Sequence, residues 1–325
     1  MIDTRRAALI ATAALAACWL ASPAFGQAGY PSQTIRFVIP AGAGGLPDTV
    51  ARILGKRLSE KLGQNVVVEN RAGGNGAVSV GVLMSSPPDG HTFIVQDGSI
   101  YAINPHIYAK MAYNIEDLTP TVAIANAPLF LASHSKVPVT SMKEFIDYVK
   151  ANPGKLNYGS SGVGSTHHLS MEALKAALGL QLTHVPFKGT SESVPALLGG
   201  HVDVAFSAYP SLSAAIGTKN ITLLATNGAA RSNMAPNAPP VADVIPGYDF
   251  APKIGIYART GTPQPILEKI ASEVAAIVKE PEIIKQFATA GIEPSGIGLA
   301  QYQAMLKADS ERAAKTVKAA GMTPL

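Results

Sequence analysis

Glycines and a helix start occur together at two places where this chain could bind an anion. The first is Ile35 to Leu54, IRFVIPAGAGGLPDTVARIL, where an apolar strand leads into Gly44, Gly45 and then Asp48, which suits the cap or first turn of a helix. A strand, a glycine turn and a helix N-terminus direct unpaired backbone N–H groups and the positive end of the helix dipole at one point. The pattern predicts an anion site, and we expect the anion to be a carboxylate.

Two better-known phosphate motifs do not match this turn. A dinucleotide-binding turn needs G-x-G-x-x-G, but counting from Gly42 the third glycine is replaced by Pro47. A P-loop needs Gly-Lys-Ser/Thr, which is absent. Taken alone, the turn also fits a merely structural connection between a strand and a helix, so the rest of the chain has to decide.

The same pattern of strand, glycine turn and helix start occurs again from Leu156 to Leu178, LNYGSSGVGSTHHLSMEALKAAL. A strand ends at Tyr158, residues 159–164 form a Gly/Ser turn, and Ser165 or Thr166 can cap the following helix. If the two turns face each other across a cleft, a carboxylate would be held from both sides. Such a ligand would favour a closed form of the protein.

Strands and helices alternate around the first turn. Strands are predicted over 34–39, 65–70 and 91–97, and helices over 49–62 and 76–87. Short, uniformly apolar strands separated by helices imply a parallel sheet covered on both faces, which binds ligands at the carboxyl ends of its strands. Asp97 and Ser99 follow the third strand and are expected at the same edge.

Around Thr119 the pattern shifts to two adjacent apolar runs separated by Pro128, which we interpret as a crossing into a second lobe. Strands are predicted there over 156–161, 182–187, 201–207 and 221–227, and helices over 142–151, 165–178, 191–198 and 212–216. Ser207 and Tyr209 follow one of these strands and are expected at the cleft edge.

An apolar strand over 253–258 marks a second crossing, and two helices over 265–279 and 299–320 have nowhere obvious to pack except the first lobe. The fold class predicted is α/β, with two lobes joined by two hinge strands around a cleft, as in type II periplasmic binding proteins (Venus flytrap). Lobe 1 is predicted to span 29–128 and 252–325, and lobe 2 to span 129–251.

The N-terminus predicts export. Arg5 and Arg6 precede an apolar run over 7–20 and two small-x-small cleavage sites, so residues 1–26 match a secretory signal peptide that is too short to span a membrane. The export route stays open, because the paired arginines loosely resemble a twin-arginine signal rather than an ordinary Sec signal. We expect a periplasmic protein, with lipid anchoring through Cys18, which ends a lipobox-like run, as the less favoured alternative.

Composition narrows the chemistry further. Cys18 is the only cysteine, so cysteine catalysis, zinc–thiolate sites and iron–sulfur clusters are excluded from the processed chain. The formal charge of +4 is a mild bias toward anionic small molecules, and no basic run suggests nucleic acid. About 300 residues are enough to form a core without disulfides.

Seven blocks from Tyr30 onward, in their order and spacing, resemble the substrate-binding receptors of tripartite tricarboxylate transporters, often called Bug-type periplasmic receptors. They read YPSQTIRFVIPAGAGGLPD, VVVENRAGGNGAVSV, SSPPDGHTF, INPHIY, LNYGSSGVGSTHHLSMEAL, VPFKGTSESVPALLGGHVDVAFS and GIYARTGTPQPILEKIASEV. The resemblance implies a monomeric receptor that binds a dicarboxylate, an aromatic carboxylate or a similar solute and delivers it to membrane permease subunits. It implies no catalysis, cofactor or metal.

The expected ligand-binding residues come from the two turns, as in the family, and from the nearby strand ends. They are Ala43, Gly44, Gly45, Leu46, Asp48, Asp97, Ser99, Ser161, Gly162, Gly164, Ser165, Thr166, His167, Ser207 and Tyr209. Two features depart from the family pattern, which more often has small or hydroxyl residues at Leu46-Pro47 and a small residue at His167.

Two histidines and one lysine need separate interpretation. His167 and His168 are adjacent at a helix start, so their side chains point about 100° apart and only one can face the cleft. We expect His167 to face it and His168 to pack structurally, with no third ligand for a metal. Lys188 fits either a second ligand carboxylate or, as the favoured interpretation, a salt-bridging hinge lysine.

Two other functions stay open at this point. Residues 159–163 nearly match the nucleophile elbow G-x-S-x-G of serine hydrolases, but the last glycine is displaced by one position and no acid is placed to orient a histidine. A ligand sensor that passes its closed state to a membrane signalling protein would need the same closing motion as a transport receptor. No sequence feature separates these last two roles.

Overall fold

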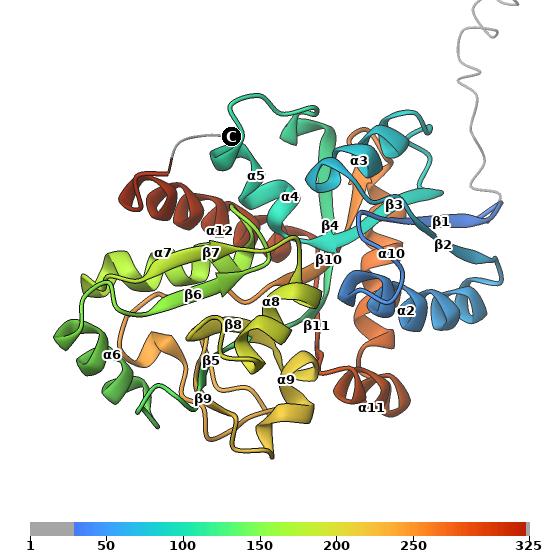
Figure 1. The fold of residues 1–325 in the computed structure, drawn as a ribbon. Helices are drawn as coiled ribbons and strands as arrows, with labels where there is room; N and C mark the ends of the chain where they lie inside the picture. Colours follow the sequence, from blue (N-terminus) through green and yellow to red (C-terminus); the bar gives the residue numbers. More distant parts are fainter. Residues whose placement is uncertain (1–28, 323–325) are drawn as a thin grey trace, which may run out of the picture.

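The computed structural model describes residues 29–322, and it forms two α/β lobes, each built around its own sheet (Figure 1). This architecture confirms the predicted fold class. The predicted signal peptide and Cys18 lie outside the described residues. Within 29–322, no helix combines the length and apolarity that a membrane crossing needs.

Lobe 1 contains a six-stranded sheet with the strand order β11-β4-β10-β3-β1-β2. The strands are β1 (Ile35–Ile39), β2 (Val66–Asn70), β3 (Thr92–Asp97), β4 (Leu118–Asn126), β10 (Lys253–Arg259) and β11 (Glu293–Ile297). Its helices are α2 (Leu46–Leu62), α3 (Ala77–Met84), α4 (Ser99–Ala102), α5 (Asn104–Ile107), α10 (Gln264–Ile277), α11 (Pro281–Thr289) and α12 (Leu299–Ala319), with short 3-10 turns at Gly74–Gly76 and Ile115–Asp117. Helices α2, α10 and α11 bury apolar side chains on one face, and α3 and α12 cover the other.

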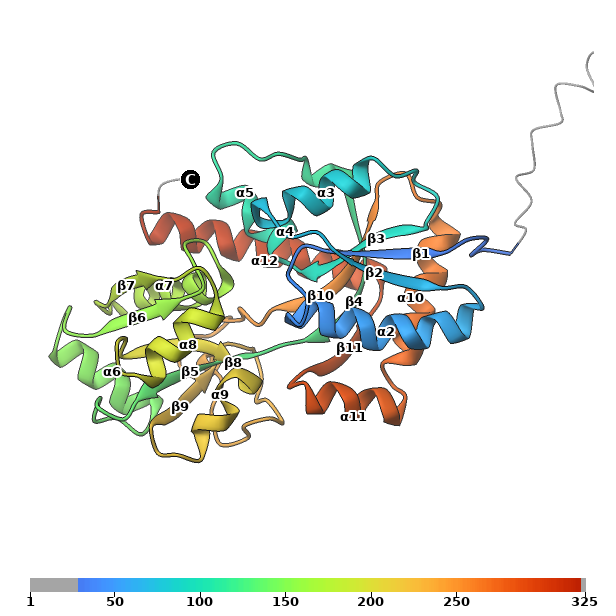
Figure 2. The same cartoon turned by 45° about the vertical axis from the view of Figure 1, so that its right-hand side comes forward.

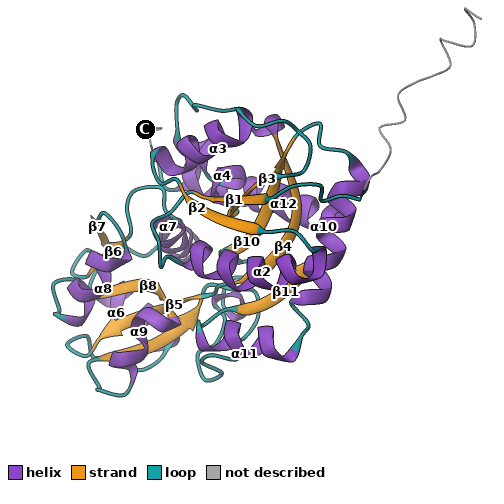
Figure 3. Ribbon diagram, turned by 90° about the vertical axis from the view of Figure 1, so that its right-hand side faces the viewer, coloured by secondary structure: helices purple, strands orange, loops and turns teal. Residues whose placement is uncertain are grey.

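Lobe 2 contains a five-stranded sheet with the strand order β7-β6-β8-β5-β9. The strands are β5 (Leu129–His134), β6 (Asn157–Ser160), β7 (Thr183–Pro186), β8 (Val204–Ala208) and β9 (Ile221–Thr226). The helices are α6 (Met142–Ala151), α7 (Thr166–Leu178), α8 (Thr190–Leu198) and α9 (Tyr209–Ile216), with a 3-10 turn at Val241–Asp243. Helices α6 and α7 pack on one face and α8 and α9 on the other. Figure 3 shows the strands of both lobes in orange and their helices in purple.

The parallel pairing predicted for the strands over 34–97 is confirmed, but the complete sheets are mixed. In lobe 1, β1 pairs in parallel with β2 and β3, but β10 runs antiparallel to both β3 and β4. In lobe 2, β6 is parallel to its neighbours, whereas β5 is antiparallel to β8 and β9. Strands β5 and β10 each come directly after a crossing between the lobes. They enter their sheets from the hinge side, opposite to the strands beside them.

Several predicted elements differ from the structure at their ends. Helix α2 begins at Leu46, three residues earlier than predicted, with Gly45 as its N-cap and Pro47 in its first turn. A proline is favoured at this position because it supplies a helical φ and its missing N–H would have no helical partner. The segment between the two predicted C-terminal helices folds into α11 and the edge strand β11, which were not predicted.

Two chain segments and one helix join the lobes (Figure 2). The chain crosses between β4 and β5 at 127–128 and returns before β10 at 249–252. Helix α12 buries Tyr302 and Leu306 in lobe 1, while Ala313 and Val317 pack with Leu169 of lobe 2. The expectation that the C-terminal helices pack only on lobe 1 is therefore wrong for the second half of α12.

Candidate functional site

A cavity of about 420 Å³ lies between the lobes, and both glycine turns reach it. Lobe 1 and the hinge contribute Gly44, Gly45, Leu46, Pro47, Gln96, Asp97, Ser99, Asn104, Pro252 and Ile254. Lobe 2 contributes Leu129, Ser161, Gly164, Ser165, Thr166, His167, Thr190, Ala208 and Ser211. The structure thus brings together ten of the fifteen expected ligand-binding residues in one cavity wall.

Asp48 holds the first turn together and does not line the cavity. Asp48 is 2% exposed, and its carboxylate accepts hydrogen bonds from Gly44 N–H (2.9 Å), Arg52 Nε (3.0 Å) and Asn70 Nδ2 (3.0 Å). Burial alone would raise the pKa of Asp48, but these hydrogen bonds, led by Arg52, hold that pKa below its ordinary value. The Asp48 side chain therefore stabilises the turn as an anion and is not part of the cavity wall, which leaves its backbone N–H for the predicted ligand contact.

The sequence predicts that the glycine N–H groups are free to bind an anion, but most of them donate hydrogen bonds within their own turns. In the first turn, Gly44 N–H donates to Asp48 and Gly45 N–H approaches Gly42 O at 3.3 Å. In the second turn, Gly162 N–H donates to Ser160 Oγ (3.2 Å), and Gly164 N–H donates to His168 Nδ1 (3.1 Å). A buried turn must satisfy its own polar groups, so these amides stabilise the turns.

The donors that remain lie in the first turns of the two helices. In α2 the N–H groups of Leu46 and Asp48 have no acceptor within residues 29–322, and in α7 the same holds for Thr166 and His167. The Ser165 side chain caps α7 by accepting from His168 N–H (3.2 Å), as predicted. The anion site predicted for the glycines therefore moves to the helix N-termini, one from each lobe.

Two further helices of lobe 2 begin at the same cavity. Thr190 is the first residue of α8, and Ala208 and Ser211 belong to the start of α9. All these helices follow strands of the two sheets, so the cavity lies at the carboxyl ends of those strands, where α/β sheets bind ligands. The concentration of helix starts gives the cavity wall a positive electrostatic bias without any cationic side chain.

His167 and His168 divide their roles as expected. His167 lines the cavity, its Nδ1 lies 2.8 Å from Ser161 Oγ, and its Nε2 is buried without a partner among the described residues. His168 accepts the Gly164 N–H and stacks on His184 with ring centroids 4.0 Å apart. His168 therefore stabilises the second turn without lining the cavity.

Replacing His167 with glutamine is expected to make the protein less sensitive to acid. Burial lowers the pKa of His167 from 6.5 to about 4, so between these pH values the unfolded chain binds a proton that the folded chain does not. The contribution of His167 to the free energy of unfolding is therefore complete above pH 6.5 and is lost as the pH falls toward 4. The loss is roughly 1–2 kcal/mol between pH 7 and pH 5. Urea unfolding at pH 7 and at pH 5 should show that His167→Gln loses less free energy of unfolding than the wild type. Equal losses in the two proteins would contradict this.

Asp97 presents one open carboxylate oxygen at the carboxyl end of β3. Its Oδ1 accepts hydrogen bonds from the Ser99 N–H (3.0 Å) and from the Ser99 hydroxyl, whereas Oδ2 has no partner among the described residues. Burial raises the pKa of Asp97 above its ordinary value. Asp97 is thus a buried carboxyl group in the wall of the cavity, and it forms no ion pair with any of the described residues.

Four other expected residues lie outside the cavity wall: Ala43, Gly162, Ser207 and Tyr209. Ser207 is fully buried within β8, and Tyr209 packs edge-on against Phe130. Ala208 and Ser211 line the cavity instead. Side chains alternate along a strand, so an error of one residue in the strand end selects the opposite face.

Sequence reasoning missed several polar residues that line the cavity: Gln96, Asn104, Thr190 and Ser211. Gln96 directly precedes Asp97, and its position near the end of an apolar strand was an available signal. Thr190 follows a glycine at a helix start, which is the same pattern as the two turns that were recognised. Asn104 offered no such signal, because the short α5 that carries it was not predicted.

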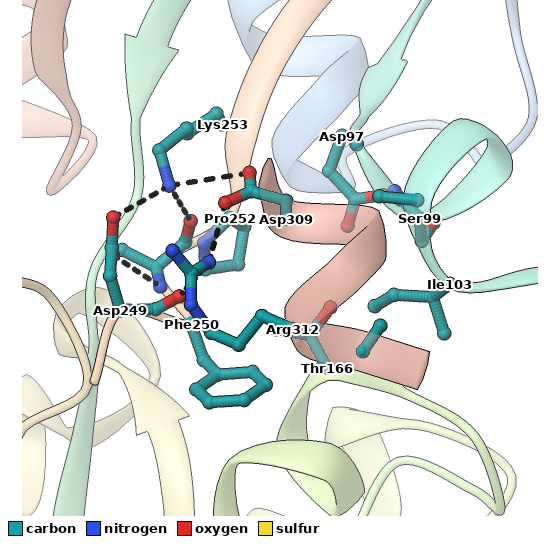
Figure 4. A pocket seen from close by; sticks show the side chains of 14 residues that line it. Asp97, Ser99, Ile103, Thr166, Asp249, Phe250, Pro252, Lys253, Asp309 and Arg312 are labelled. Atoms are coloured by element: carbon teal, nitrogen blue, oxygen red, sulfur yellow. Dashed lines mark hydrogen bonds and ion pairs between the residues drawn. The ribbon is translucent and has the colours of Figure 1, made fainter. Parts of the chain in front are cut away.

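The hinge lysine is Lys253 and not Lys188. Lys188 is exposed between β7 and α8, where its backbone N–H donates to Glu192 (3.1 Å), and its side chain forms no ion pair within 29–322. Lys253 is 7% exposed, and its Nζ lies 3.0 Å from Asp249 Oδ2 and 3.5 Å from Asp309 Oδ2. Arg312 completes this cluster by donating to Asp309 (2.6 Å) and to the Asp249 carbonyl (2.8 Å). Figure 4 shows how the cluster ties the second crossing to α12 beside Asp97 and Thr166.

The lobes also touch at two other places. A Cβ added to Gly164 of lobe 2 would lie 2.3 Å from Ile107 Cδ1 of lobe 1. On the other side, Glu293 of β11 accepts hydrogen bonds from the Ser232 hydroxyl (2.7 Å) and from Asn233 N–H (3.1 Å). Both are direct contacts between the two lobes.

The Ser161–His167 pair does not complete a hydrolase triad. A triad needs a carboxylate on the second ring nitrogen of the histidine, which fixes its tautomer and stabilises its charged form. Within residues 29–322, His167 Nε2 has no such partner, and a pKa of about 4 makes this imidazole a weak base at neutral pH. The observed geometry suits hydrogen bonding to a ligand better than nucleophilic attack.

Comparison with known proteins identifies the family. The family model described as "Tripartite tricarboxylate transporter family receptor" matches residues 50–322. The UPF0065 protein in the gbd 5′ region of Cupriavidus necator is 34% identical over 310 residues, which cover 95% of this chain and 92% of that protein. The structure of R. palustris Rpa4515 with adipate is similar with a TM-score of 0.80 and 33% identity, covering 91% of this chain and 100% of that one. The periplasmic binding protein BugD is similar with a TM-score of 0.75 and 26% identity, covering 91% and 100%. This chain belongs to the receptor family of the tripartite tricarboxylate transporters.

Proposed function

We propose that this protein is a periplasmic receptor that captures a carboxylated organic solute and delivers it to the membrane permease of a tripartite tricarboxylate-type transporter, without catalysing a reaction. The observation that carries the proposal is that the first turns of α2 and α7, from opposite lobes, both reach one cavity. Family membership supports the transport role, and the R. palustris relative holds adipate, a dicarboxylate.

The proposed mechanism is a population shift toward the closed form. A carboxylate accepts hydrogen bonds from Leu46 and Asp48 N–H in lobe 1 and from Thr166 and His167 N–H in lobe 2 only when the lobes are together. Each charge-assisted hydrogen bond contributes about 1.5–3 kcal/mol before the entropy of binding is subtracted. Four of them can support micromolar affinity, about −8 kcal/mol.

The lobe boundaries that go with this mechanism are 29–128 with 252–325 for lobe 1, and 129–251 for lobe 2. We also propose that the receptor acts as a monomer, because a single chain supplies both walls of the cavity. The closed surface formed by both lobes is then the shape that the permease recognises.

A thermal-shift screen tests the proposed function. Aliphatic dicarboxylates and aromatic carboxylates are compared with the uncharged amides of the same carbon skeletons, and amino acids with their amides, which lack the carboxylate. We expect at least one carboxylate to raise the melting temperature and its amide to leave it unchanged, since the helix N-termini favour negative charge. A melting temperature that rises with a neutral solute and with no carboxylate would refute the proposal.

A further inference from the structure

The cavity has a donor pole and an acceptor pole. The donor pole consists of the unpaired N–H groups at the starts of α2 and α7. The acceptor pole lies at the end of β3, where Asp97 Oδ2 has no partner among the described residues and Gln96 Oε1 is buried without one. Both residues line the same 420 Å³ cavity as the two helix starts.

No cationic side chain lies in this cavity wall to balance Asp97. Neither lysine nor arginine is among the described residues that line it. Asp97 also lines the adjoining small cavity of Figure 4, but the two cations there are already paired, because Lys253 binds Asp249 and Asp309 while Arg312 binds Asp309. Burial raises the pKa of Asp97, which reflects the cost of holding this carboxylate without a counter-charge.

We propose that the ligand carries a protonated amine in addition to its carboxylate, and that Asp97 and Gln96 bind this amine. The inference rests on the proposed function, because the helix N-termini must hold the carboxylate for the other end of the ligand to reach β3. The ligand class is then an amino carboxylate, with one group of each charge.

A ligand with two carboxylates fits this cavity less well. Its second carboxylate would lie beside Asp97, another anionic group, with no lysine or arginine in the described wall to compensate. Like charges that share a buried site repel unless one of them takes up a proton. An ammonium group instead donates to the open oxygens of Asp97 and Gln96 and balances the buried charge.

Calorimetric titration of the wild-type protein tests the proposal with ligands that share one carbon skeleton. Hexanoate is compared with 2-aminohexanoate, 6-aminohexanoate, 6-hydroxyhexanoate and adipate. We expect one of the two amino acids to bind at least tenfold more tightly than hexanoate and adipate. Tighter binding of adipate, of hexanoate or of the hydroxy acid would overturn the inference and leave the proposed function intact. Failure of every carboxylate here and in the thermal-shift screen would refute the proposed function itself.

The variant Asp97→Asn assigns the effect to the acceptor pole. This change keeps the size of the side chain and removes its charge, so the preference for the amino acid over hexanoate should fall at least tenfold, while hexanoate binds no more weakly than before. Asp147→Asn is the matched control, because Asp147 lies on the exposed face of α6 and pairs with Lys143. Melting temperatures of both variants show whether the fold is kept. An unchanged preference in a folded Asp97→Asn protein would contradict the assignment, as would a lost preference in the control.

Discussion

Replacing Thr166 with proline is expected to weaken carboxylate binding about 10- to 100-fold while leaving the fold intact. Thr166 is the first residue of α7, its side chain lines the cavity, and its N–H has no acceptor within residues 29–322. Proline removes this N–H together with the threonine side chain, and it is favoured at the first helical position. The preceding Ser165 has φ −66° and ψ 158°, an extended conformation that suits a residue before proline. The expected loss corresponds to one charge-assisted hydrogen bond of about 1.5–3 kcal/mol.

Thr166→Ala is the matched control for this change. It removes the hydroxyl and keeps the backbone N–H, so it separates the side chain from the amide. Titration calorimetry with the best carboxylate from the screen should give a large loss for the proline variant and a small one for the alanine variant. Equal affinity of Thr166→Pro and the wild type, with melting temperatures unchanged, would show that this amide does not hold the ligand.

Replacing Gly164 with alanine is expected to lower ligand affinity at least tenfold by preventing closure of the lobes. The added Cβ would lie 2.3 Å from Ile107 Cδ1, and Ile107 is buried in the cluster that joins the lobes. Gly164 also has φ +77°, which costs an L-residue about 1–2 kcal/mol. That backbone cost is present in the open and closed forms alike, so it lowers stability, whereas the steric clash acts only on closure.

Gly179→Ala provides the control for backbone strain. Gly179 ends the same helix with φ +64°, and an added Cβ meets nothing within 4 Å. Both alanine variants should therefore lose similar stability in urea unfolding, but only Gly164→Ala should lose affinity. Adding Ile107→Val, which removes Cδ1, should restore much of the affinity. Equal affinities for the two glycine variants would mean that this contact does not limit closure.

Much of the candidate site could be predicted because its signals are local. A strand, a glycine turn and a helix start follow one another within about ten residues at both turns. Ser165 caps α7 as its residue type predicts, and Pro47 lies in the first turn of α2. His167 faced the cavity as expected because its helical position relative to His168 is fixed by the 100° rotation per residue.

The remaining features depend on contacts between distant residues. Asp48 uses the amide of Gly44, and His168 uses that of Gly164, so the sequence could not show which amides stay free. The directions of β5 and β10 follow from how the chain enters each lobe after a crossing. In the hinge cluster, Lys253 pairs with Asp309, which lies more than fifty positions further along the chain. No local sequence pattern marks such a pair.

A crystal structure of the protein with its tightest-binding carboxylate would show whether both lobes hold the anion. We expect carboxylate oxygens about 3 Å from N–H groups at the starts of both α2 and α7, or joined to them by one ordered water molecule. A carboxylate that contacts only one lobe, or that is held by lysine or arginine side chains elsewhere, would contradict this expectation.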